Sequence, residues 1–169
     1  MSSARLPKIV FVALLLVAAS DVYRRYPLLP NCMASHFDAA GNANGRQSKQ
    51  AFFTLYAGVT ALILVIGFLL PRIIRVLPAS LINLPNKDYW LAPERRAETL
   101  AFFETQFGWF ACALYFLLMC VFAEAMRANL RTPPRMSASV SFLLVGFLIF
   151  VVAWSVRFFL RFRGLAAPH

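Results

Sequence analysis

His36 and Asp38 are the residues whose types and spacing best fit chemistry. They flank Phe37, so in an extended backbone both side chains point the same way and Phe37 points to the other side. A histidine beside a carboxylate can relay protons or contact a metal, and an imidazole titrates near physiological pH. Two ligands are too few for a metal site. We favour the structural alternative, in which Phe37 packs on the protein and Asp38 accepts backbone N–H groups of the following turn.

Asn42 and Asn44 partly fit the spacing of a calcium-binding loop. A loop that begins at Ala40 would have these amides at its third and fifth positions and Gly45 at its sixth. It would lack the acidic ligands of the first and twelfth positions, so the EF-hand pattern fails. Gly41 and the Asn44-Gly45 pair instead predict reversals of the chain.

Glu104 is the one acid clearly inside an apolar segment. An ionisable group within a membrane is by default a hypothesis of function. Small residues at helical spacing predict a close helix–helix contact that would turn Glu104 toward protein: Ala101, Thr105, Gly108 and Cys112. The alternative, which we weigh equally, is an interfacial salt bridge with Arg72, Arg75 or Arg96.

Composition assigns these residues to a membrane protein. The chain has 169 residues, of which 60% are apolar and 14% charged, against about 25% charged in ordinary soluble domains. A chain this short cannot hide so much apolar surface from water, which excludes a soluble domain, and disorder requires low hydrophobicity. The net charge of +10 does not indicate nucleic acid, because the basic residues lie between apolar runs, as in membrane proteins with cationic loops.

Four segments are apolar enough to cross a bilayer, which takes about 20 residues. The first is the shortest, and Lys8 and Arg24 at its ends would extend toward the headgroups. We therefore predict an all-α membrane fold with four transmembrane helices and an ordered extracytoplasmic loop between the first two. It forms a single domain over residues 1–169 with spans at about 6–24, 51–70, 100–123 and 138–157.

The basic residues also predict orientation. Ten Lys and Arg lie on the side of both termini and seven on the other side, which favours cytoplasmic termini in a bacterial inner membrane. Pro93 suits the first turn of a helix, so the third helix should begin there, outside the bilayer, and end before Thr132-Pro133-Pro134. Its start and the preceding loop should form a collar, with these candidates for interfacial or partner contacts: Asn86, Asp88, Tyr89, Trp90, Arg95 and Arg96.

The loop after the first span carries a recognisable motif, namely Leu29-Pro30, His36-Phe37-Asp38, Gly41, Asn44-Gly45 and Ser48-Lys49. It resembles a bacterial domain-of-unknown-function family of small polytopic membrane proteins, over about residues 8–70. The same domain opens SdpI-type membrane proteins, which confer immunity to a secreted peptide toxin and take part in its signalling. The resemblance adds Lys49 to the candidate residues. It also implies that the first helix is retained, against the alternative of a cleaved signal peptide. Arg46 stands where the family often has Trp.

These features predict a non-enzymatic protein that binds a partner in toxin immunity, sensing or envelope stress. The alternative is a small proton-coupled carrier that uses His36, Asp38 and Glu104 and needs a polar path across the bilayer. No nucleophile–base pair or metal-ligand cluster stands out, so we expect no cofactor. The expected partners are membrane lipids and a protein or peptide, and the sequence leaves a homo-oligomer open.

Overall fold

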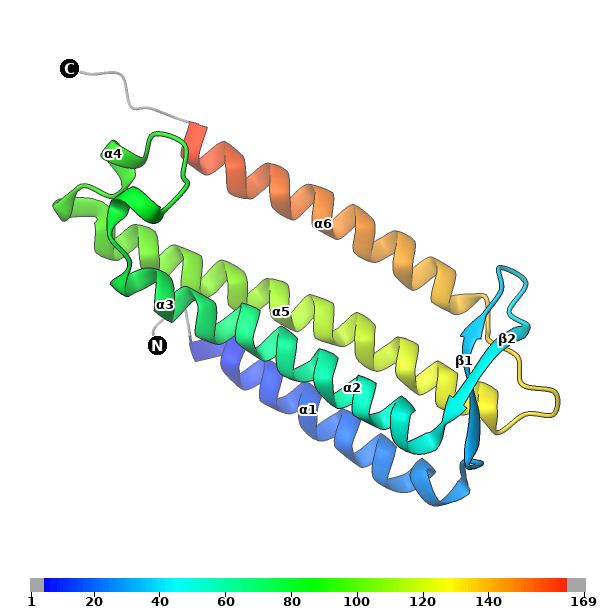
Figure 1. Cartoon of the computed structure of the whole chain (residues 1–169). Coiled ribbons are helices and arrows are strands. Elements are labelled where there is room, and N and C mark those ends of the chain that lie inside the picture. The colour runs from blue at the N-terminus through cyan, green and yellow to red at the C-terminus, as the bar shows by residue number, and fades with distance from the viewer. Residues whose placement is uncertain (1–4, 164–169) are drawn as a thin grey trace.

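The computed structural model describes residues 5–163 and consists of four long helical segments with a small sheet at one end of the bundle (Figure 1). The elements in chain order are α1 (Arg5–Arg25), η1 (Tyr26–Leu28), β1 (Cys32–Phe37), β2 (Ala43–Ser48), α2 (Lys49–Leu64), η2 (Val65–Leu69), α3 (Leu70–Val76), η3 (Ala79–Leu81), α4 (Lys87–Trp90), α5 (Pro93–Asn129) and α6 (Ser139–Arg163).

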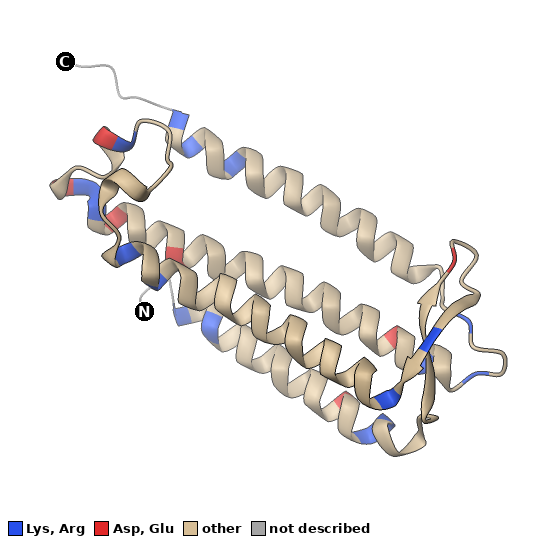
Figure 2. Cartoon of the chain, in the orientation of Figure 1, with Lys and Arg blue, Asp and Glu red and all other residues tan. Residues whose placement is uncertain are grey.

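The chain is a multi-pass membrane protein, because four of its helical segments are long and apolar enough to cross a bilayer. These segments contain the predicted spans to within one residue: Arg5–Leu28, Lys49–Val76, Pro93–Asn129 and Ser139–Arg163. Lys, Arg, Asp and Glu gather toward the two ends of the bundle and leave its middle uncharged (Figure 2). Since charge is costly in hydrocarbon, this uncharged middle is the part that spans the membrane.

Helix α5 is the centre of the bundle and packs against α1, α2 and α6. Its small residues allow close approach, as predicted. A side chain at Gly67 would collide with Ala111 of α5, and a Cβ at Gly108 would lie 2.9 Å from the Cβ of Pro7. The Cys112 thiol donates to the Pro7 carbonyl over 3.2 Å. Small residues take this role in membranes because lipid supplies no hydrophobic drive between helices.

The second span runs further than predicted, because the helix does not end at Pro71. A proline ring clashes with the carbonyl four residues earlier in an α-helix, which here belongs to Gly67. The chain avoids the clash with a π-helical turn, η2, in which the Leu70 N–H bonds to the Val65 carbonyl. The helix then continues through Pro71 as α3.

Helix α5 begins at Pro93 and ends at Asn129, before the Thr132-Pro133-Pro134 stop, as the sequence predicts. Its 37 residues extend over about 55 Å at 1.5 Å per residue. This exceeds the roughly 30 Å hydrocarbon core, so α5 projects beyond the membrane and can carry structures at both ends.

The loop between the first two spans is ordered, as predicted, but it is an antiparallel β-hairpin, β1 and β2. Its register runs from Cys32 opposite Ser48 to Phe37 opposite Ala43, with irregularities on both sides of His36. The prediction of a reversal at Asn44-Gly45 is wrong, because both residues lie within β2. The chain reverses at residues 38–42, where Gly41 has a positive φ of 82° and a side chain would collide with the Met136 carbonyl oxygen.

The connection between α3 and α5 covers the other end of the bundle, and we call residues 78–92 the collar. Its buried side chains pack with α5 and with the end of α6: Ile82, Leu84 and Leu91 against Leu100, Phe103 and Phe162. Phe162 has no exposed surface, and its carbonyl accepts hydrogen bonds from the Asn86 amide at 3.0 Å and the Trp90 indole at 3.4 Å. The predicted collar is therefore present, and it holds the end of α6.

Candidate functional site

The hairpin holds four of the candidate residues, His36, Asp38, Asn42 and Asn44, and Asp38 closes its turn. The Asp38 carboxylate accepts from the Asn42 backbone N–H at 2.8 Å and from the Asn42 side-chain amide at 3.2 Å. These bonds hold the pKa of Asp38 below its usual value, so the carboxylate is ionised at neutral pH. Phe37 packs with the buried cluster of Leu29 and Met33. The structural alternative for Phe37 and Asp38 is confirmed.

His36 and Asp38 do not form a pair. The His36 Nδ1 atom lies 3.2 Å from the Ser35 hydroxyl, whereas Asp38 is engaged by Asn42. His36 lies opposite Gly45 in the sheet. A Cβ added at Gly45 would lie 3.0 Å from the His36 Cβ. No group of three or more His, Cys, Asp or Glu side chains within residues 5–163 is placed to hold a metal ion. Of the two motif asparagines, Asn42 bonds to Asp38 in the turn and Asn44 is exposed on β2.

Lys49 joins the start of α2 to the end of α1. Its ammonium group donates to the carbonyls of Leu29 at 2.9 Å and Tyr26 at 3.3 Å, and it lies 4.6 Å from the centre of the Tyr26 ring. Cations commonly satisfy the free carbonyls at the end of a helix. The Ser48 side chain accepts from the Ala51 N–H and caps α2. The Ser48-Lys49 end of the motif is therefore structural.

Asn129, which the sequence analysis missed, fixes the hairpin to the bundle. Its side-chain oxygen accepts from the Ala34 N–H at 2.7 Å, and its nitrogen donates to the Ala34 carbonyl at 2.9 Å. The same nitrogen donates to the Ala125 carbonyl of α5 at 2.9 Å. The amide thus pairs with β1 as a neighbouring strand would. Nothing in the sequence distinguishes Asn129 from an ordinary asparagine near a helix end.

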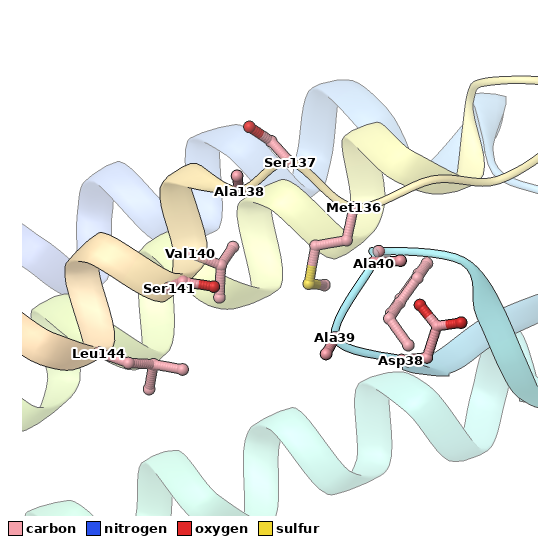
Figure 3. Close-up of a pocket in the computed structure, with 11 residues that line it drawn as sticks. Asp38, Ala39, Ala40, Met136, Ser137, Ala138, Val140, Ser141 and Leu144 are labelled. Atoms are coloured by element: carbon pink, nitrogen blue, oxygen red, sulfur yellow. The ribbon is translucent and has the colours of Figure 1, made fainter.

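The tip of the hairpin forms a small pocket with the start of α6. Figure 3 shows residues 38–40 on one side, Val140, Ser141 and Leu144 on the other, and the Met136 side chain between them. The pocket has a volume of about 200 Å³ and combines an apolar wall with polar groups. The Met136 N–H donates to the Gly41 carbonyl at 2.8 Å, which ties the tip to the segment before α6.

Glu104 lies near the opposite end of the bundle from the hairpin and forms salt bridges. Its carboxylate is 3.0 Å from the Lys8 ammonium and 3.9 Å from the Arg75 guanidinium. The salt-bridge alternative is confirmed, with Arg75 among the expected partners and Lys8 an addition. Along α5, Glu104 is 25 residues from Asn129, or about 37 Å. The structure therefore does not bring Glu104 together with His36 and Asp38.

Two further acids lie at the hairpin end of the bundle. The Glu124 side chain is only 8% exposed and pairs with Arg127 at 3.2 Å and Arg131 at 3.6 Å. Its spacing of three and seven residues to these arginines is a helical signal that the sequence analysis overlooked. Asp21 pairs with Arg25 at 2.9 Å, which local spacing predicts.

Most of the candidate residues in and beside the collar contact other residues of this chain. The Arg95 guanidinium lies 3.8 Å from the centre of the Tyr89 ring, and Arg96 donates to the Leu77 carbonyl at 2.6 Å. Asn86 and Trp90 hold Phe162, as described above, while Asp88 is exposed. Arg95 thus ties α4 of the collar to α5, and Arg96 ties the end of α3 to α5.

Comparisons of the chain with models of protein families, with curated proteins and with solved structures give no match.

Proposed function

We propose that this chain is a non-enzymatic protein of the bacterial inner membrane that binds a peptide or protein partner through its hairpin. The excess of basic residues at the collar end favours cytoplasmic termini and a hairpin on the outer surface. The resemblance of the hairpin motif to the domain of immunity proteins supports a role in toxin immunity, sensing or envelope stress.

The free edge of β2 is the observation that carries the proposal. Opposite residues of an antiparallel pair either exchange hydrogen bonds or both point their N–H and C=O groups away. Ala34 directs both groups to Asn129, so Arg46, which lies opposite Ala34, directs its own groups away from β1. Within residues 5–163 no hydrogen bond from a turn, a loop or a side chain reaches the Arg46 N–H or carbonyl. An extended peptide can add to such an edge as a third strand.

The rest of the hairpin favours this mode of binding. One edge of the sheet is fixed by Asn129, so the free edge is held in position before any partner arrives, which lowers the entropy cost of association. The exposed side chains of β2 are Asn44, Arg46 and Ser48, so the surface is polar and basic. The pocket at the tip, with about 200 Å³, is large enough for one side chain of the partner.

Two substitutions of Arg46 test the proposal, because they separate the contribution of its backbone N–H to binding from that of its side-chain charge. Arg46→Pro removes the outward N–H without removing a bond to β1 and is compatible with an edge position. Arg46→Ala keeps the N–H and removes the charge. With a photo-reactive residue at Asn44 in cells, we expect an adduct with a single partner that Arg46→Pro reduces at least tenfold and Arg46→Ala reduces much less.

Protease resistance of the purified variants checks that Arg46→Pro retains the hairpin. An adduct of equal yield in a folded Arg46→Pro variant would refute strand addition at this edge. A larger loss in Arg46→Ala than in Arg46→Pro would show that charge, rather than the backbone, recognises the partner.

A further inference from the structure

We infer that a groove between α5 and α6, near the collar end of the membrane span, binds the phosphate headgroup of an anionic phospholipid. The groove has a volume of about 430 Å³, within the range of roughly 300–1,000 Å³ of ligand sites. It is lined by Gln106, Trp109, Phe150, Ala153, Trp154 and Arg157. None of these residues is acidic, so Arg157 gives the groove a positive charge.

Arg157 is a cation without an anion in the described part of the chain. At this end of the bundle Lys8 and Arg75 pair with Glu104, and Arg161 pairs with Glu98 at 3.0 Å. No hydrogen bond or salt bridge to Arg157 exists within residues 5–163. Its side chain lies on the exposed side of α6, where a guanidinium readily binds phosphate oxygens.

The neighbouring polar groups also favour an acceptor-rich ligand. The indole N–H of Trp154 is buried and has no acceptor in the described structure. Trp109, which is 37% exposed, also lines the groove. Tryptophan at this position is typical of residues that contact lipid headgroups. The groove therefore combines the Arg157 guanidinium and the Gln106 amide with two tryptophan rings, one of which has an indole N–H without an acceptor.

The depth of the groove selects a lipid over a soluble anion. Arg157 is the first charged residue on α6 after 18 uncharged positions, and it lies one turn, about 6 Å, inside Arg161. Headgroup phosphates are the anions available at this boundary. Beyond the groove, the rings of Phe110, Phe147 and Phe150 continue along the contact between α5 and α6 and offer an apolar path for an acyl chain.

Quenching of tryptophan fluorescence by brominated lipids tests this site in the full chain, because two of the three tryptophans, Trp109 and Trp154, line it. In mixed vesicles we expect brominated phosphatidylglycerol to quench with about fivefold preference over brominated phosphatidylcholine, the effect of one cation near the surface. Arg157→Gln should abolish the preference, whereas Arg157→Lys should retain most of it. Arg163→Gln, which removes an equal charge from the same helix outside the groove, should leave it unchanged.

Thermal unfolding of each variant checks that the bundle is intact. We expect an unchanged melting temperature in the Arg157 variants, because Arg157 has no hydrogen bond or salt bridge to another described residue. An equal loss of preference in Arg163→Gln would overturn the site in favour of general surface charge. Complete reversal of the preference by millimolar inorganic phosphate would assign the groove to a free anion. Equal quenching by both lipids in the unmodified chain would also refute the inference.

Discussion

Asn129→Ala is expected to free the hairpin from the bundle and to lower the free energy of unfolding by about 3 kcal/mol. The substitution removes three buried hydrogen bonds. It leaves the Ala34 N–H and carbonyl without partners at a residue that is 0% exposed, and each unsatisfied buried group costs about 1–3 kcal/mol. Hydrogen exchange in a lipid bilayer should show loss of protection at Ala34, with the centre of the spans unaffected.

Two variants make this result specific. Asn44→Ala removes an exposed asparagine from the same hairpin and should change stability by less than about 0.5 kcal/mol. Asn129→Asp keeps the acceptor for the Ala34 N–H but turns a carboxylate toward two carbonyl oxygens, so it should also release the hairpin. Unchanged protection of the Ala34 amide in Asn129→Ala would mean that the side-chain amide does not hold β1.

Phe162→Ala is expected to detach α6 from the collar and to cost about 3 kcal/mol or more. Phe162 has no exposed surface and contacts four aromatic rings, with centroids between 5.3 and 5.7 Å away: Trp90, Phe102, Phe103 and Phe158. Alanine leaves a cavity where these rings meet. The loss should appear as a lower melting temperature in detergent and as faster proteolysis of the collar.

The adjacent turn of α6 supplies the control. Phe159 is 55% exposed on the lipid-facing side, so Phe159→Ala should change the melting temperature little. Phe162→Leu retains most of the buried volume and should cost less than about 1.5 kcal/mol. Equal effects of Phe162→Ala and Phe159→Ala would indicate that lipid contact, rather than the collar, determines the stability of this end.

Much of the helical architecture could be predicted because hydropathy and proline act locally. The uncharged runs give the four spans, and Pro93 and Thr132-Pro133-Pro134 bracket α5. The continuation past Pro71 could not be predicted, because it requires the π-helical turn Val65–Leu69. Proline is ordinarily a signal that a helix ends, and no local pattern indicates that this turn accommodates it.

The hairpin was predicted as ordered but not as a sheet, for a similar reason. Ala43–Ser48 contains neither alternating apolar residues nor β-branched side chains, which are the usual signals of a strand. It is a strand because it pairs with β1, and β1 in turn is bonded to Asn129, which is 95 residues from Ala34 in sequence. The Asp38 turn was predictable, since it involves only the next four residues. The Lys8–Glu104 pair, which spans 96 positions, was not.

An outer binding surface requires that the hairpin and the collar lie on opposite sides of the membrane, with the hairpin outside. Asn44→Cys and Lys87→Cys, both at exposed positions, test this in a chain whose Cys32, Cys112 and Cys120 are replaced by serine. A membrane-impermeant maleimide applied to intact cells should label Asn44→Cys, and should label Lys87→Cys only after the membrane is permeabilised. Labelling of both in intact cells, or of Lys87→Cys alone, would contradict the proposed topology and the outer binding surface.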